Sequence, residues 1–105
     1  MDPFFSIITP VKNGELFIKQ YLQCLINQTF VNFEVIIIDD RSYDNSIKIL
    51  KENINEDKRF RIIYVSEKKI CNSPYLARNI GIDSSRGKFI CFLDIDDYWL
   101  PHKLQ

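Results

Sequence analysis

Three carboxylates follow one apolar run near the end of the chain. Residues 89–93 (FICFL) are continuously apolar, and Asp94, Asp96 and Asp97 come directly after them. Acids this close repel one another unless a cation joins them. Mg²⁺ and Mn²⁺ prefer oxygen ligands and are usually held by one or two carboxylates together with phosphate oxygens of a substrate. The pattern favours a metal–diphosphate site; the alternative is that the acids only end a strand and face water.

A second acidic pair, Asp39 and Asp40, ends the apolar run at residues 33–38 (FEVIII). A carboxylate there can accept a hydrogen bond from a ribose hydroxyl or from a base N–H. A dinucleotide-binding fingerprint would also place an acid here, but the segment TPVKNGE after the first apolar run lacks G-x-G-x-x-G. The alternative is that the pair only favours the N-terminus of the next helix through its macrodipole.

Two further side chains are candidates for chemistry. Arg78 lies beside the apolar stripe of a predicted helix, where it either meets phosphate oxygens or is an ordinary surface residue. His102 is the only histidine, and nothing near it in the sequence orients it as a catalytic base. The aromatic residues near the acids, Phe89, Phe92, Tyr98 and Trp99, are better explained by packing than by sugar stacking.

Composition excludes several classes of function. The 105 residues favour a single domain. Fourteen basic residues balance fourteen acidic ones, so no net field indicates a nucleic acid or an anionic membrane as partner. Two small basic clusters, residues 58–61 and 68–69, are expected to be solvated faces.

The cysteines and the lengths of the apolar stretches indicate in which cellular compartment the protein is expected. Cys24, Cys71 and Cys91 form no C-x-x-C pair, which argues against a zinc or redox motif and favours a reducing compartment. The sequence contains no signal peptide and no apolar stretch of about 18 residues. We therefore expect a cytoplasmic location, with membrane association of a longer enzyme left open.

Four apolar runs alternate with helical patterns. The runs at 4–11, 33–39, 60–66 and 89–95 predict strands, and the continuous ones predict strands covered on both faces. Helices are expected from 15 to 28 with Asn13 as cap, from 42–45 to 54, and from Ser73-Pro74 to a stop at Gly87. This β-α-β-α-β-α-β order predicts an α/β fold, a Rossmann-like three-layer parallel sheet.

Ligands of open parallel sheets bind beyond the carboxyl ends of the strands. The residues that follow the four runs should therefore share one edge of the sheet. They are Thr9, Pro10 and Val11, then Asp39 and Asp40, then Ser66 and Glu67, then the three acids at 94, 96 and 97. That edge is acidic at two separate places although the chain as a whole is neutral.

Two long segments together resemble a known family. Residues 6–46 (SIITPVKNGELFIKQYLQCLINQTFVNFEVIIIDDRSYDNS) and 77–104 (ARNIGIDSSRGKFICFLDIDDYWLPHKL) resemble the N-terminal half of family 2 glycosyltransferases with the GT-A fold. The agreement covers the Thr-Pro after the first strand, QTF-x-x-FEVIIIDD-x-S, ARN-x-G, the D-x-D-D strand end and W-x-P-x-x-L, in order. Each motif is weak alone, and the ordered set is specific.

The resemblance implies a role for each matching residue. The segment Thr9, Pro10 and Val11 would line the nucleotide pocket. Asp40 would contact the uracil or an equivalent base, and Arg78 would lie near the nucleotide. The acids would hold ribose and a divalent metal, Mn or Mg, on the diphosphate: Asp94 and Asp96 toward the nucleotide-sugar, and Asp97, with Asp96 next, as metal ligands.

Four positions depart from the family's usual pattern. Arg41 stands where glycine is usual, Tyr43 where threonine is common, Asn72 where glycine is frequent and Lys88 where glutamate is frequent. None of these changes removes an expected ligand. Arg41 calls the local turn geometry into question and bears on which nucleotide is preferred.

The family's catalytic domain continues well past the D-x-D strand. The resemblance therefore implies that residues 1–105 are a single, incomplete catalytic domain, which binds the nucleotide-sugar donor of an inverting transferase, with UDP as the expected nucleotide. The base and the site for a glycan or lipid-linked acceptor would lie beyond Gln105, and this chain would be inactive alone. The alternatives are a Mg²⁺-dependent nucleotidyltransferase, or a non-catalytic module that self-associates through an exposed sheet edge.

Overall fold

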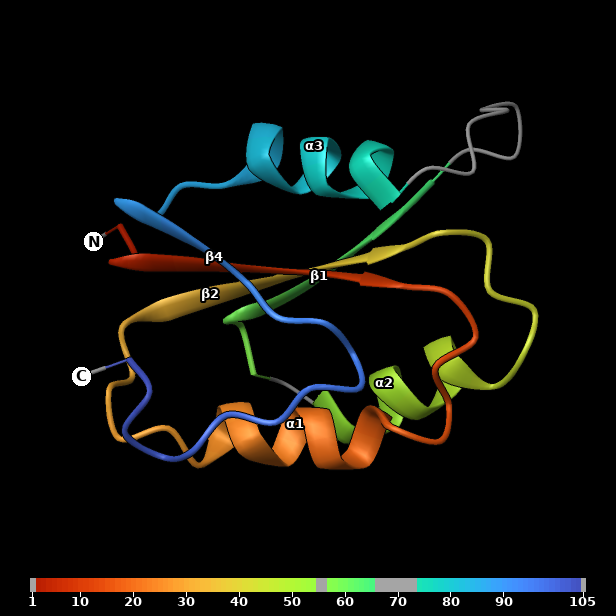
Figure 1. Ribbon diagram of the computed structural model, residues 1–105, viewed down its shortest axis with the longest axis horizontal. Coiled ribbons are helices and arrows are strands. Elements are labelled where there is room, and N and C mark those ends of the chain that lie inside the picture. Colours follow the sequence, from red (N-terminus) through yellow and green to blue (C-terminus); the bar gives the residue numbers. More distant parts are fainter. Residues whose placement is uncertain (1, 55–56, 66–73, 105) are drawn as a thin grey trace.

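A four-stranded, all-parallel sheet forms the centre of the molecule (Figure 1). The computed structural model describes residues 2–54, 57–65 and 74–104. The elements, in chain order, are β1 (Phe5–Val11), α1 (Ile18–Ile26), β2 (Phe33–Asp39), α2 (Ser46–Ile54), β3 (Phe60–Tyr64), α3 (Pro74–Ser84) and β4 (Phe89–Phe92). The strand order is β3-β2-β1-β4, with α1 and α2 on one face and α3 on the other. The predicted three-layer α/β fold is confirmed.

Two apolar cores explain why these segments fold together. Alternate residues of the central strands point to opposite faces, so Val35 and Ile37 pack on the α1–α2 side, while Ile36 and Ile38 pack under α3. Every residue of β2 is buried, as its continuous apolar run predicts. The expected inward faces of α2 and α3 are also present: Leu50 and Ala77 are buried, and Ile47, Ile54, Leu76 and Ile80 pack partly buried around them.

The expectation that β4 is covered on both faces is wrong. β4 pairs only with β1, and no strand among the described residues pairs with its outer side. The side chains of Phe89 and Phe92, which point to opposite faces of the sheet, are 50% and 45% exposed, so neither face of this edge strand is fully covered. The apolar run does continue inward at Leu93, which is buried.

Two residues expected to end helices, Asn13 and Gly87, have other roles in the structure. Asn13 does not cap α1, which begins at Ile18 without a side-chain cap; its Oδ1 instead accepts hydrogen bonds from the N–H groups of Tyr43 and Asp44. α3 ends at Ser84, before Gly87, and Gly87 has no positive φ. A Cβ at Gly87 would lie 2.5 Å from Ser6 Oγ, so close packing on β1 explains this glycine. Ser66, Glu67, Cys71, Asn72 and the expected cap Ser73 lie outside the described residues.

A buried carboxylate, Glu34, lies at the amino ends of the strands, at the end of the sheet opposite the three acids. Glu34 on β2 accepts hydrogen bonds from Ser6 Oγ, from Arg61 and from the Arg86 N–H, and its side chain is 5% exposed. Burial opposes ionisation of Glu34, but these hydrogen bonds outweigh it, so its pKa is lowered from the ordinary value. The cluster ties the α3–β4 connection to β1 and β2.

Candidate functional site

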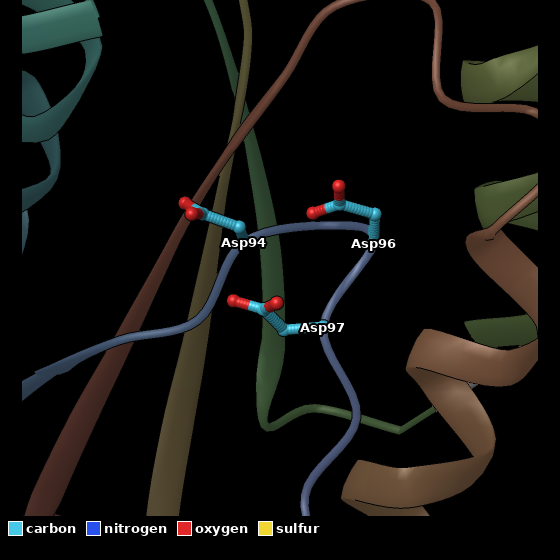
Figure 2. A group of neighbouring side chains, drawn as sticks. All are labelled: Asp94, Asp96 and Asp97. Carbon is cyan, nitrogen blue, oxygen red and sulfur yellow. The ribbon is translucent and has the colours of Figure 1, made fainter.

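The three predicted acids converge on one short loop after β4 (Figure 2). Each of Asp94, Asp96 and Asp97 offers a carboxylate oxygen that lies within 4.8 Å of the others, and all three are exposed. The Asp97 N–H donates to the Asp94 carbonyl over 3.0 Å, which closes a β-turn and brings the side chains together. Oxygen donors at this spacing fit the ligand preference of Mg²⁺ or Mn²⁺.

Pro10 explains why the acidic loop leaves the sheet where it does. β4 pairs with β1 only as far as Ile8 and Phe92, and the Leu93 N–H donates to the Ile8 carbonyl. Pro10 is the next β1 residue whose backbone faces β4, and it has no N–H to donate. The ladder ends there, so the following residues turn away from β1.

The loop is fixed to the core between its acids. Ile95 packs against the α1-side core, whereas Asp94 and Asp96 on either side of it are exposed. A Cβ at Gly14 would lie 3.1 Å from the Ile95 side chain, so the β1–α1 loop approaches the acidic loop closely. This contact explains the D-x-D spacing: the middle residue anchors and the flanking acids face solvent.

Arg78 reaches the acidic loop from α3. Its Nη2 lies 3.7 Å from Asp94 Oδ1, and its guanidinium lies 5.7 Å from the centre of the Phe92 ring. The side chain is 34% exposed, so this pair contributes little to stability. No basic side chain among the described residues forms an ion pair with Asp96 or Asp97.

Asp40 lies at the carboxyl end of β2, on the other side of β1. Its N–H donates to the Val11 carbonyl over 2.8 Å, and its carboxylate pairs with Arg41. The alternative role, stabilising the α2 N-terminus, belongs to another residue: α2 begins at Ser46, and Asp44 accepts the Ser46 N–H.

Thr9, Pro10 and Val11 form the end of β1 instead of the loop after it. The Thr9 side chain is fully buried, and its Oγ1 accepts a 2.6 Å hydrogen bond from Tyr21, whose pKa is raised by burial. Val11 is part of the α1-side core, so Pro10 alone among the three is partly exposed. These residues lie between Asp40 and the acidic loop, because β1 separates β2 from β4.

A hydrogen-bonded clamp, which was not predicted from the sequence, joins the loops after β1 and β2. The Gly14 N–H donates to Ser46 Oγ, the Asn13 N–H donates to Ser42 Oγ, and Asp44 accepts from the Ser46 and Glu15 N–H groups. Burial disfavours the charged form of Asp44, but the bonds from Ser46 and Glu15 prevail and lower its pKa. The turn dipeptide Asn13-Gly14 was the available signal.

Other candidate residues lie in structural contacts. His102 Nδ1 lies 3.4 Å from Thr29 Oγ1 on an exposed part of the C-terminal segment. In the basic cluster, Arg59 pairs with Asp57 and Arg61 with Glu34. Trp99 packs against the α1-side core, as expected for a packing role.

Solved glycosyltransferase structures of the GT-A class share this fold. The structure of S. aureus TarS residues 1–349 in complex with UDP superposes with a TM-score of 0.86 at 29% identity, over 96% of this chain and 30% of that one. The mannosyltransferase PcManGT of Pyrobaculum calidifontis, in complex with GDP-Man and Mn²⁺, has a TM-score of 0.82 at 19% identity, a likeness of fold. It covers 94% of this chain and 29% of that chain.

The chain belongs to glycosyl transferase family 2, whose family model matches residues 6–105. It is 40% identical to a glycosyltransferase of Haemophilus influenzae over 98% of this chain and 40% of the relative. It is 38% identical to the amylovoran biosynthesis glycosyltransferase AmsB of Erwinia amylovora, over 99% of this chain and 34% of the relative. The chain thus spans less than half the length of these relatives. No helix among its described residues has the length and apolar character needed to cross a membrane.

Proposed function

We propose that this chain binds the donor of an inverting glycosyltransferase, a nucleotide-diphosphate sugar with UDP as its nucleotide. The observation that carries the proposal is the cluster of Asp94, Asp96 and Asp97, within 4.8 Å of one another at the carboxyl edge of a parallel sheet. Arg78 flanks this cluster, and Asp40 lies across β1 from it. Family membership and the likeness to UDP-bound TarS support the same donor class.

The three acids would have different roles in binding the diphosphate. Asp97 and Asp96, which carry no ion pair within the described part of the chain, would hold a divalent cation, Mn²⁺ or Mg²⁺. The cation, when bound, neutralises charge that develops on the departing nucleoside diphosphate. Asp94 is already paired with Arg78, so these two would orient the ribose and phosphate side of the donor.

The nucleoside would lie across the end of β1. β2 and β4 flank β1 in the sheet, so these two strands run about 10 Å apart at the usual strand spacing. A nucleoside diphosphate is long enough to reach from Asp40 to the acidic loop. Thr9, Pro10 and Val11 would form the floor of this pocket, largely through backbone and the Pro10 ring, because Thr9 and Val11 are buried.

Transfer itself needs parts that we expect beyond Gln105. In an inverting reaction a base deprotonates the acceptor hydroxyl, which displaces the nucleoside diphosphate in one step. We propose that the base and the site for a glycan or lipid-linked acceptor belong to the rest of a longer enzyme in polysaccharide biosynthesis. The enzyme would act on the cytoplasmic side, with any membrane attachment outside this chain.

Calorimetric titration tests the donor site directly. UDP should bind in the presence of Mn²⁺, and binding should fall at least tenfold without Mn²⁺ or in Asp97→Asn. Asp83→Asn, an exposed acid on α3 outside the cluster, is the matched control and should bind UDP like the unchanged chain. Release of pyrophosphate from UTP by the chain would instead support a nucleotidyltransferase.

One observation favours a second role, self-association through β4. Phe89, Ile90 and Phe92 are 50%, 39% and 45% exposed along the edge strand. Since Phe89 and Leu93 donate to β1, the backbone groups of Ile90 and Phe92 point away from it. We propose that a second copy can pair along this edge when nothing else covers it.

A further inference from the structure

Arg41 has a backbone conformation that is unfavourable for residues other than glycine. Its φ is 57°, in the left-handed region where glycine is unstrained and a long side chain is uncommon. Among the described non-glycine residues, only Asn13 shares a positive φ. Strain of this kind persists where the surrounding contacts hold it, often at binding sites.

The Arg41 side chain binds the carboxylate of the preceding residue, Asp40. Arg41 Nε and Nη2 lie 3.0 and 2.9 Å from the same oxygen, Asp40 Oδ1. The Asp40 side chain is 13% exposed and that of Arg41 21%, so the pair is mostly shielded from water. With Oδ1 held and the backbone N–H bonded to Val11, the position of Oδ2 is fixed as well.

A fixed acceptor can discriminate between nucleobases. The ring N3 of uracil carries a hydrogen and donates to a carboxylate, whereas N3 of cytosine carries a lone pair that repels one. Such discrimination requires an oxygen that cannot rotate away from the unfavourable partner. Without Arg41, the carboxylate group of Asp40 would be able to rotate about its side-chain bonds.

We infer that Arg41 is a positioning residue that fixes the Asp40 carboxylate against the imide N–H of a uracil-type base, and so sets a preference for uridine over cytidine nucleotides. The inference rests on the proposed function, because it assumes that the nucleoside lies at Asp40. It adds Arg41 to the residues proposed for the donor site.

The test compares three ligands, each with Mn²⁺: UDP, CDP and inorganic pyrophosphate. Arg41→Gly is the informative variant because glycine accepts the left-handed conformation, so the loop keeps its course. We expect UDP to bind roughly tenfold more weakly to Arg41→Gly, with little change for CDP, so that the UDP-to-CDP preference falls by a similar factor. Pyrophosphate, which has no base, should bind the variant and the unchanged chain equally.

Three outcomes would overturn the inference. Unchanged or tighter UDP binding by Arg41→Gly, with the preference intact, would show that Arg41 has no positioning role. Equal losses for UDP, CDP and pyrophosphate would show a general disturbance of the site. If the unchanged chain bound pyrophosphate but no nucleotide, the proposed nucleoside position would fail as well, whereas UDP binding unaffected by Arg41→Gly would leave the proposed function standing.

Discussion

The surroundings of Asp94, Asp96 and Asp97 differ from those of three acids with structural roles. Glu34, Asp44 and Asp57 each accept hydrogen bonds from nearby groups, and the pKa of each is lowered. The three acids after β4 are exposed and close together instead. A structural acid is surrounded by donors, whereas a site for a cation leaves its oxygens accessible.

Much of this arrangement was predictable residue by residue. Acids after two strands of a parallel sheet must share an edge, and the structure shows this arrangement. The ion pair between Arg78 and Asp94 was not predicted, and the expected place of Arg78 near the nucleotide stays a prediction. The burial of Thr9 was not predictable, because it depends on a partner elsewhere in the chain, Tyr21. For Arg41, the resemblance had called the local turn geometry into question, and the structure gives this residue a left-handed φ.

Arg41 gives a stability prediction at the residue scale. Arg41→Ala and Arg41→Gly both lose the pair with Asp40, but only alanine keeps the strain at φ 57°. We expect Arg41→Ala to be less stable than Arg41→Gly by about 1 kcal/mol in urea unfolding. Equal stabilities would mean that the turn rearranges when the arginine is removed.

Glu34 gives a prediction of pH dependence. Its folded pKa lies below its ordinary value of 4.5, so its contribution to stability is complete above that value and is lost as pH falls through the folded pKa. Glu34→Gln should cost about 2 kcal/mol at pH 7, because Arg61 loses its charged partner. Denaturant titrations from pH 7 to 3 should show this gap narrowing below pH 4.5; a constant gap would contradict the account.

At the scale of elements, the helices and central strands were predicted better than the contacts between loops. α1, α2 and β1–β3 lie close to the expected positions, because apolar periodicity reports burial directly. The exposure of β4 was missed, since a continuous apolar run does not reveal whether a neighbouring strand is present. The clamp between Gly14 and Ser46 was missed because it joins residues far apart in sequence.

Removing the clamp should weaken both stability and the site. Ser46 is buried, and its Oγ accepts the Gly14 N–H, so Ser46→Ala leaves that donor unsatisfied. We expect a loss of about 2 kcal/mol on urea unfolding, together with weaker UDP binding, because Gly14 contacts the acidic loop. Ser85→Ala, which removes an exposed hydroxyl, is the control and should cost under about 0.5 kcal/mol. Similar losses for both variants would argue against the clamp.

At the scale of the molecule, β4 is the open side of the sheet. We predict that the chain forms dimers at high concentration in sedimentation velocity, and that Ile90→Lys, which places a charge on the edge, shifts it to monomer. Tyr43→Lys, at an exposed residue in the β2–α2 loop, is the matched control and should leave the dimer intact. A monomer at every concentration would rule out pairing along β4.

We propose above all that the acids after β4 bind a divalent cation that recruits a nucleoside diphosphate. Thermal unfolding with Mn²⁺, with UDP and with both tests it most directly, in the unchanged chain and in Asp97→Asn. A ligand at a hundredfold excess over its dissociation constant stabilises the folded state by about 2.7 kcal/mol. We predict a raised midpoint only with both ligands present, and no such shift in Asp97→Asn. A cooperative transition that neither ligand moves, or a shift that persists in the variant, would contradict the account.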